Sequence, residues 1–178
     1  MQIRTTAPDA EYGHHIFEIA GTKIVDGSIV GQCFHQYLRP PRKEDSWFPS
    51  YGAPPCFLRE DISFAQIASG FVNYMRGTHV VMHNGRLDLE LLDQELNAAG
   101  LDPMRSYCAS ITDTSVMARG VFGNGVRCSS LEALCLKLGL VPPDEDTYQF
   151  GPSYVALVAR LYLAICHASN PPPSPSSP

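Results

Sequence analysis

The segment from residue 80 to residue 96 constrains the fold of this chain more than any other part of the sequence. It opens with the apolar run Val80-Val81-Met82, which is typical of a buried strand, and continues with leucines at helical spacing up to Leu96. Asp88 falls at the start of that helix, shortly after the strand ends. A strand that leads into a helix in this way indicates an α/β fold, and a carboxylate at the junction is well placed to hold a divalent cation.

The remaining apolar patterns predict a mixed sheet flanked by helices. Asp26-Gly27 is a two-residue turn signal between two strand-like runs and indicates an antiparallel hairpin. Strands are expected at residues 16–25, 28–38, 78–82 and 107–111, and helices at residues 64–75, 87–99, 113–121, 131–138 and 152–167. Early antiparallel strands followed by strands that are joined through helices are typical of an α/β fold with one mixed sheet.

Length and composition indicate one globular domain with a short tail. The chain has 178 residues and is 44% hydrophobic, which is enough for a single core. We expect the domain over residues 1–168 and a disordered tail, rich in proline and serine, over residues 169–178. The net charge of −5 gives no overall attraction to nucleic acid, so such binding would depend on a local patch such as the 39–43 cluster.

The cysteines and the apolar runs bear on cofactors and location. The six cysteines show no C-x-x-C spacing, so a zinc site is not expected. The sequence contains no signal-peptide pattern and no apolar run long enough to cross a bilayer. We therefore expect free thiols, no membrane association, and a cytoplasmic or organelle-matrix location rather than secretion.

A set of short blocks, taken in order along the chain, carries a family resemblance. The blocks are Glu18-Ile19-Ala20 with its hairpin to Tyr37-Leu38-Arg39-Pro40, then Phe64-Ala65, His83-Asn84 with Asp88, Thr112-Asp113-Thr114, and Ser130-Leu131-Glu132-Ala133-Leu134-Cys135. Together they resemble the DnaQ-like (DEDDh) 3′–5′ exonucleases, the family that includes the proofreading epsilon subunit of bacterial DNA polymerase III. The resemblance implies a ribonuclease-H-like fold, removal of nucleotides from a 3′ end, and two magnesium or manganese ions.

The resemblance also implies four catalytic carboxylates and one histidine, of which this sequence keeps one. Counting back from the first hairpin strand, the two carboxylates of the first motif fall on Gln2 and Arg4. The third carboxylate is Asp88 and is retained. The last histidine and aspartate align without a gap with Gln149 and Tyr154, because the helix that follows keeps its register.

These replacements change the expected chemistry. An amide, a guanidinium and a phenol supply almost none of the negative charge that two divalent cations require, so we expect no bound cofactor. We also expect Arg4 to take the vacated cation position and to pair with Asp88, because an unpaired buried carboxylate is costly. One alternative stays open: Asp9 and Glu11 form an Asp-x-Glu pattern which, with Asp88, would rebuild a site for Mg²⁺ or Mn²⁺.

Further residues fall where the family meets its substrate, and each has a structural explanation as well. These residues are Thr5, Thr6, His83, Asn84 and Arg86. Threonines at a strand end are common strand formers, a histidine at a strand tip often packs and hydrogen-bonds, and Asp88 itself suits the first turn of a helix.

Two hypotheses of different classes follow for the function. The first is an exonuclease-like domain with a degenerate site, a pseudoenzyme, that binds a protein partner in a replication, repair, defence or ribonucleoprotein assembly, or binds single-stranded nucleic acid. The second is an active metal-dependent 3′–5′ exonuclease with a rearranged site built from Asp9, Glu11 and Asp88. Because the chain is acidic, the first hypothesis favours a protein partner over nucleic acid.

Overall fold

The computed structural model describes residues 1–5, 15–39, 62–123, 130–140 and 151–169. Its strands are β1 (Gln2–Thr5), β2 (Ile16–Val25), β3 (Ser28–Tyr37), β4 (His79–Met82) and β5 (Ser110–Asp113). Its helices are α1 (Phe64–Met75), α2 (Arg86–Ala98), the short 3₁₀ helix η3 (Met104–Ser106), α3 (Thr114–Phe122), α4 (Leu131–Lys137) and α5 (Gly151–Ser169). This order confirms the predicted α/β class.

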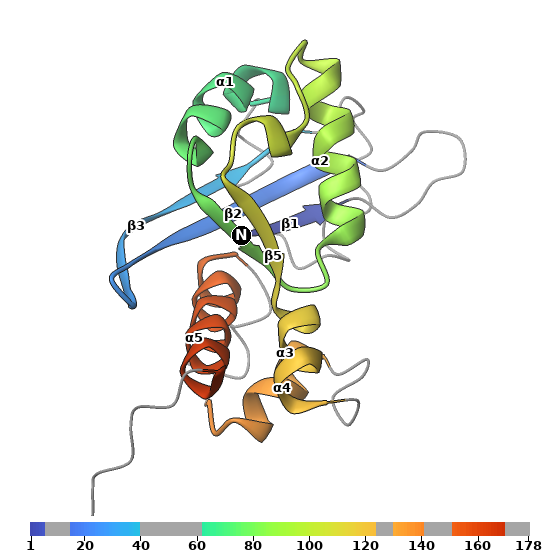
Figure 1. Ribbon diagram of the computed structural model, residues 1–178. Coiled ribbons are helices and arrows are strands. Elements are labelled where there is room, and N and C mark those ends of the chain that lie inside the picture. Colours follow the sequence, from blue (N-terminus) through green and yellow to red (C-terminus); the bar gives the residue numbers. More distant parts are fainter. Residues whose placement is uncertain (6–14, 40–61, 124–129, 141–150, 170–178) are drawn as a thin grey trace, which may run out of the picture.

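The described strands form two hydrogen-bonded groups (Figure 1). In one group β2 lies between β1 and β3 and is antiparallel to both. In the other group β4 and β5 are parallel, as expected for strands that are joined through a helix. The two groups meet where the Met1 ammonium donates to the Val81 carbonyl oxygen at 2.7 Å. Both antiparallel and parallel pairing are therefore present, as predicted, but the described strands form two hydrogen-bonded sheets rather than one.

The turn between β2 and β3 has the geometry that its sequence predicts. Asp26 has φ of 48° and Gly27 has φ of 73°. Two left-handed residues in a two-residue loop define the turn whose twist matches a hairpin. The predicted hairpin is therefore confirmed.

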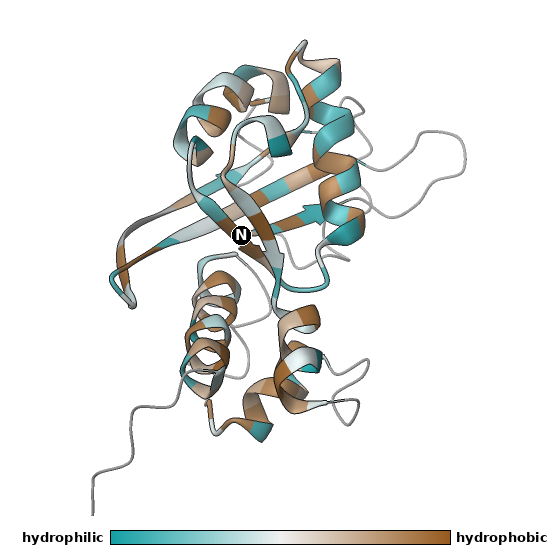
Figure 2. Ribbon diagram, viewed as in Figure 1, coloured by the Kyte–Doolittle hydropathy of each residue, from teal (hydrophilic) through white to brown (hydrophobic). Residues whose placement is uncertain are grey.

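Apolar side chains pack on both faces of the β4–β5 group. Val80 and Met82 point into a core with β1, β2, α1 and α2, whereas Val81 packs against a second core built by α3, α4 and α5. This alternation follows from the two-residue period of a strand. Figure 2 shows the brown apolar stripes of the helices against their teal outer faces. Asp88, six residues after Met82, interacts with the backbone of Ile3, which belongs to the first core, and with Tyr154, which packs against the second.

The strand boundary that differs most from its prediction is the start of β5. The segment from Tyr107 to Ile111 was expected as a strand, but β5 begins only at Ser110. The residues before it hydrogen-bond to the loop ahead of β4: Gly77 N–H donates to the Tyr107 carbonyl, and Ala109 N–H donates to the Thr78 carbonyl, both at 2.8 Å.

None of the helices in the described ranges is both long and apolar enough to span a membrane.

Candidate functional site

Asp88 is held in place by a turn that a second carboxylate clamps. It lies in the first turn of α2, directly after the turn Asn84-Gly85, in which Asn84 has φ of 52°. The Asp113 carboxylate at the end of β5 accepts the N–H groups of Asn84 at 3.1 Å and Gly85 at 3.0 Å. It also accepts the N–H of Ser115 at 2.8 Å and so caps α3. Asp113 therefore ties the ends of both parallel strands together.

The environment of Asp88 favours its neutral form. Burial raises the pKa of Asp88 to about 6, although a hydrogen bond from the Ile3 backbone opposes the rise. Tyr154, on the first turns of α5, lies near enough for the two groups to interact: burial first, and then the charge of Asp88, raise the pKa of the Tyr154 phenol to about 12. A protonated phenol thus stands beside the carboxyl group that the sequence singled out.

A buried ion network lies on the neighbouring strands. Glu18 on β2 is only 1% exposed, and its carboxylate contacts Arg4 Nη1 at 2.7 Å and His35 Nε2 at 2.7 Å. Burial opposes ionisation of Glu18, but the hydrogen bonds with His35 and Arg4 outweigh it, so the pKa of Glu18 stays below its ordinary value. The Arg4 guanidinium also lies 4.8 Å from the centre of the Phe17 ring. Arg4 is therefore a structural cation fixed between two strands.

The first residue of α5 presses against this network. Gly151 donates its N–H to Gln2 Oε1 at 3.0 Å and has φ of 57°, a left-handed conformation that favours glycine. A Cβ at this position would lie 2.8 Å from Glu18 Oε1 and 3.2 Å from His35 Nε2. Gln2 and Gly151 thus bring β1 and the start of α5 into direct contact.

His83 is held by a hydrogen-bond chain that fixes its tautomer. Its Nδ1 lies 2.8 Å from Thr114 Oγ1, and Thr114 Oγ1 lies 3.2 Å from the Met82 carbonyl oxygen. Because a carbonyl only accepts, the Thr114 hydroxyl donates its hydrogen bond to Met82. It must therefore act as the acceptor of a hydrogen bond from the N–H at His83 Nδ1. The Nε2 atom of His83 then carries a lone pair and has no partner in the described part of the chain. Burial also lowers the pKa of His83, which favours this neutral form.

Only some of the predicted site residues come together. Gln2, Arg4, Asp88 and Tyr154 lie around β1 and the start of α5. Arg86 is exposed and pairs with Glu90 one turn along α2 at 3.1 Å. Thr5 ends β1 next to a register shift, and Asn84 is an exposed turn residue. Thr6, Asp9, Glu11 and Gln149 lie outside the described residues.

The predicted pairing of Arg4 with Asp88 is not what the structure favours. The ion pair of Arg4 is with Glu18, and the pKa of Asp88 is raised, whereas an adjacent guanidinium would lower it. The reason is the strand register: Arg4 lies directly opposite Glu18 on β2, and directly opposed residues share one face of a sheet.

Sequence reasoning overlooked two residues of this region, Glu18 and Asp113. Both appeared only as parts of family blocks. Glu18 lies in the middle of the apolar strand Ile16–Val25 and is buried, and a buried carboxylate needs a cation or several donors. Asp113 precedes the helix α3, where aspartate is a favoured cap. The sequence position of each residue therefore predicts that its carboxylate has hydrogen-bond or ion-pair partners.

Among the described residues, those at the positions of Gln2, Arg4, Asp88 and Tyr154 do not make a donor set that fits two divalent cations. A pair of such ions needs several hard oxygen ligands, whereas the described residues there supply Asp88, the amide Gln2 and the phenol Tyr154, beside the cation Arg4. The Glu18 carboxylate is occupied by Arg4 and His35. In the described ranges, no three His, Cys, Asp or Glu side chains are grouped so that they could hold a metal ion.

The antiparallel β1–β2–β3 group, the parallel β4–β5 pair and the carboxylate at the β4–α2 junction form the mixed α/β arrangement of a ribonuclease-H-like domain. A family model described as Exonuclease (RNase_T) matches residues 5–144. The chain belongs to this family, which confirms the resemblance drawn from the sequence blocks.

Several relatives carry the name DNA polymerase III subunit epsilon. The protein from Escherichia coli strain K12 is 34% identical over 155 residues, which cover 86% of this chain, and that from Salmonella typhimurium strain LT2 is 33% identical over the same length. The chain spans 63% of the length of both. The Rickettsia typhi protein is 31% identical over 171 residues, which cover 93% of this chain and 72% of that protein.

Proposed function

We propose that this chain is a non-catalytic member of the exonuclease family that serves as a binding module, most suitably for a protein partner. The observation that carries the proposal is the Arg4–Glu18 ion pair of 2.7 Å on β1 and β2. On the alignment above, Arg4 stands where the family has the second carboxylate of its first motif. At the position where the family has a metal-ligating carboxylate, this chain thus has the Arg4 guanidinium, which is paired with Glu18.

Electrostatics argues against a pair of metal ions near Asp88 and Arg4. At an effective dielectric constant of about 20, a guanidinium about 5 Å from a divalent cation costs on the order of 6 kcal/mol. Asp88 offers a single carboxylate at the aligned positions. The aligned base position is Gln149, and the absence of a general base usually costs about 10²–10⁴-fold in rate. Hydrolysis by the family mechanism is therefore not expected.

Charge and kinship together support a protein partner. Without bound metal ions, a chain with net charge −5 has little attraction for phosphate. The relatives named above are subunits of DNA polymerase III, so a replication assembly is the first setting to examine, with repair, defence and ribonucleoprotein assemblies as further settings. We place the chain in the cytoplasm or an organelle matrix, with residues 1–168 as the binding domain.

The decisive test is an exonuclease assay with a labelled single strand and Mn²⁺. We expect no degradation by the wild-type chain. A variant with Gln2→Asp and Arg4→Glu, made together with Glu18→Gln so that two buried carboxylates do not oppose each other, should also stay inactive, whereas adding Gln149→His and Tyr154→Asp restores the full family set and should give measurable Mn²⁺-dependent activity. Degradation by the wild-type chain that Asp88→Asn abolishes would refute the proposal.

The rearranged site is tested in the same assay. If Asp9 and Glu11 bind metal together with Asp88, the wild-type chain should degrade the strand, and Asp9→Asn or Glu11→Gln should stop it. Under our proposal both substitutions leave the result unchanged. The two variants therefore separate the alternative enzyme from the binding module.

A binding assay separates nucleic acid from protein as the partner. Filter binding of single-stranded DNA and RNA at two salt concentrations reports phosphate contacts, because such affinity falls steeply as salt rises. We expect weak or no binding at the higher salt concentration. Tight binding that persists there would favour a nucleic-acid module with base contacts over a protein-binding one.

A further inference from the structure

The far half of the β2–β3 hairpin, residues 22–30, forms an arm that extends away from the rest of the fold (Figure 1). Each of its residues is exposed or half-buried. Its apolar side chains include Val25, which is 50% exposed, and Ile29 and Val30, which are each 38% exposed. Single exposed apolar side chains are common, but a group of them on one short element is typical of an interaction surface.

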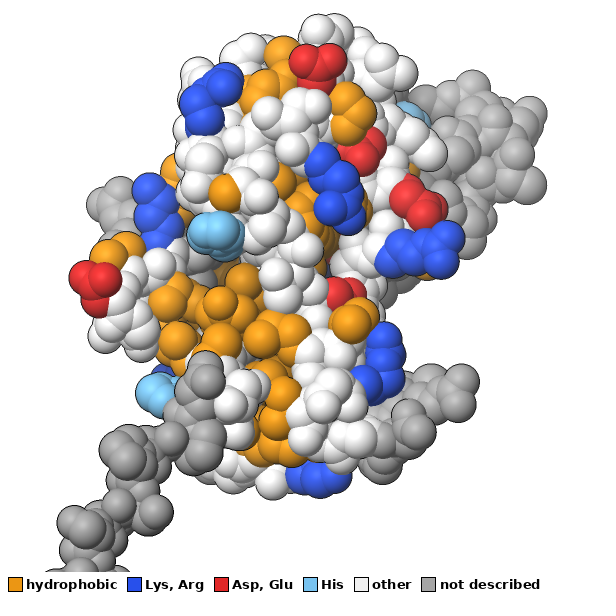
Figure 3. Space-filling view, viewed as in Figure 1, with side chains coloured by type: hydrophobic (Ala, Val, Ile, Leu, Met, Phe, Trp, Pro, Cys, Tyr) orange, Lys and Arg blue, Asp and Glu red, His pale blue; other side chains and the backbone are white. Residues whose placement is uncertain are grey.

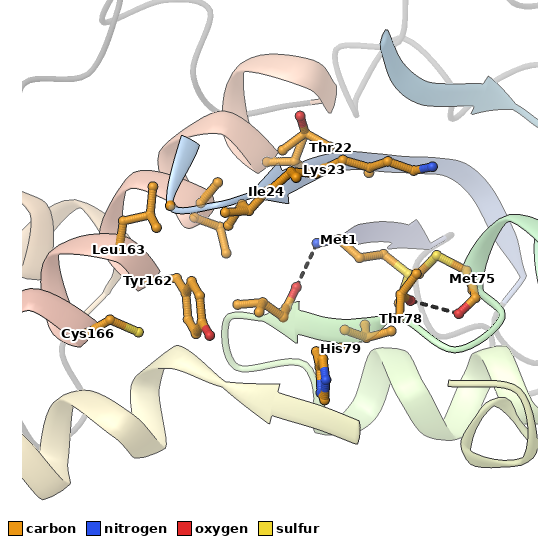
Figure 4. A pocket seen from close by; sticks show the side chains of 18 of the residues that line it. Met1, Thr22, Lys23, Ile24, Met75, Thr78, His79, Tyr162, Leu163 and Cys166 are labelled. Atoms are coloured by element: carbon orange, nitrogen blue, oxygen red, sulfur yellow. Dashed lines mark hydrogen bonds between the residues drawn. The ribbon is translucent and has the colours of Figure 1, made fainter. Parts of the chain in front are cut away.

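A groove lies beside the arm, between the arm, β4, the end of α1 and α5. The deep part of its α5 wall is closed, because Val155, Val158 and Ala159 are buried. The open rim of the groove is the half-buried part of the α5 wall, which consists of Tyr162, Leu163 and Cys166. Figure 3 shows apolar side chains between the arm and α5, and Figure 4 shows Ile24 of the arm on the hairpin side of the groove and the rim on the α5 side.

The arm carries one charge of each sign. Lys23 and Asp26 are both exposed, and the Lys23 ammonium lies 4.6 Å from the centre of the Tyr74 ring. That ammonium has three donors, so the ring contact leaves donors for a carboxylate. The Met1 ammonium also borders the groove, but Met1 is buried and its ammonium donates to the Val81 carbonyl oxygen. A strongly acidic or strongly basic partner would therefore meet a like charge on the arm.

We propose that a second copy of this chain covers this surface, in a two-fold dimer in which the arm of each copy lies against the open rim of the other. A two-fold interface uses the same patch on both copies, so that patch must contain both members of every complementary pair. This one combines a projecting apolar arm with an apolar rim, and Lys23 with Asp26. The two-fold axis brings Lys23 of each copy to Asp26 of the other.

The size of the patch predicts a weak dimer. The arm has nine residues and the rim has three, fewer than the roughly 20–30 residues that each side of a standard interface contributes. We therefore expect a dissociation constant on the order of 10 µM. Each copy has a net charge of −5, and salt at about 0.15 M limits the range of that repulsion to about 8 Å. The proposal is independent of the proposed function, because Gln2, Arg4, Asp88 and Tyr154 are not among the described residues that line the groove.

Sedimentation equilibrium of the full chain, over concentrations that span this constant, is the first test. We expect Val25→Asp and Ile29→Asp each to weaken the dimer about a hundredfold, since a loss of about tenfold at one contact occurs twice in a two-fold interface. Leu136→Asp on α4 is the matched control: Leu136 is 74% exposed, does not line the groove and should leave the dimer unchanged. Urea unfolding of each variant separates loss of the dimer from loss of the fold.

A charge exchange then tests whether the occupant is a second copy. Lys23→Glu alone places two acidic side chains at each contact, and Asp26→Lys alone places two basic ones, so each variant by itself should dimerise about tenfold more weakly. An equal mixture of the two variants restores opposite charges at both contacts and should form a mixed dimer of wild-type strength. Asp26→Asn controls for the left-handed turn, which asparagine tolerates.

Three results would overturn the proposal. The first is a wild-type chain that stays monomeric at concentrations well above the expected constant. The second is a dimer that survives both Val25→Asp and Ile29→Asp. The third is a mixture of Lys23→Glu and Asp26→Lys chains that associates no better than either variant alone.

Discussion

Replacing Asp88 by asparagine is expected to stabilise the protein at neutral pH and to change little in acid. The reason is the raised pKa of this carboxyl group, about 6 against an ordinary 3.8, for which burial is responsible. Since the folded state holds the proton more tightly than the unfolded state, the free energy of unfolding is greatest below pH 4 and falls as the pH rises towards 6. Asparagine has no such proton and keeps an oxygen for the Ile3 backbone.

The size of the effect follows from the same values. A tenfold change in proton affinity corresponds to about 1.36 kcal/mol, so the full loss above pH 6 is about 3 kcal/mol as an upper bound. The gain from Asp88→Asn should therefore grow from near zero at pH 4 to at most about 3 kcal/mol at pH 7.5. Partial access of water to Asp88 reduces the value actually measured.

Urea unfolding of the wild type and Asp88→Asn at several pH values from 4 to 8 measures this difference directly. Asp93→Asn is the matched control on the same helix, since it makes the same change of side chain and likewise keeps an oxygen for a backbone donor, the Met104 N–H that Asp93 Oδ1 accepts at 2.7 Å. A difference that is the same at every pH would refute the reasoning. So would a wild type that Mn²⁺ makes more stable than Asp88→Asn at pH 7.5, because a bound cation would keep Asp88 ionised.

Three further substitutions test the network around β1. Arg4→Ala should lower the free energy of unfolding by up to about 3–5 kcal/mol, because it removes one of the two partners of the buried Glu18 carboxylate and leaves His35, and Glu18→Gln in the same chain should recover part of the loss; equal stability of Arg4→Ala and wild type in thermal unfolding would contradict this. Gly151→Ala should cost roughly 1–2 kcal/mol or more in urea unfolding, from a left-handed backbone and a Cβ 2.8 Å from Glu18 Oε1, and a neutral result would argue against this helix start. Asp113→Ala should cost on the order of 1–2 kcal/mol for the lost cap, and should speed amide hydrogen exchange at Gly85; unchanged exchange would argue against the clamp.

Local signals accounted for most of the fold. The β2–β3 hairpin followed from Asp26-Gly27, whose two left-handed residues need no distant contact to be specified. The start of β5 did not follow, because Tyr107 is as apolar as a strand residue. It hydrogen-bonds instead to Gly77, far back in the sequence, and only the tertiary structure reveals that bond.

The candidate site was predictable in its position but not in its pairing. The place of Asp88 at the β4–α2 junction was readable, since strand, turn and helix follow one another without a break. The partner of Arg4 depends on the register between β1 and β2, two strands that are separated in the sequence by residues 6–15. Neither local periodicity nor motif spacing fixes that register. The burial of Glu18 in an apolar strand, by contrast, was a signal that reasoning from motifs passed over.

The ion pair between Arg4 and Glu18 also bears on how this lineage can change over time. On the alignment proposed here, a single mutation that returned a carboxylate to position 4 would set two acidic side chains against each other in the protein interior, with only His35 to separate their charges. Such an intermediate would fold poorly before it regained any ancestral ability. A return to a carboxylate at position 4 would therefore require a second substitution at position 18. The ion pair thus makes the replacement at position 4 difficult to reverse by single mutations.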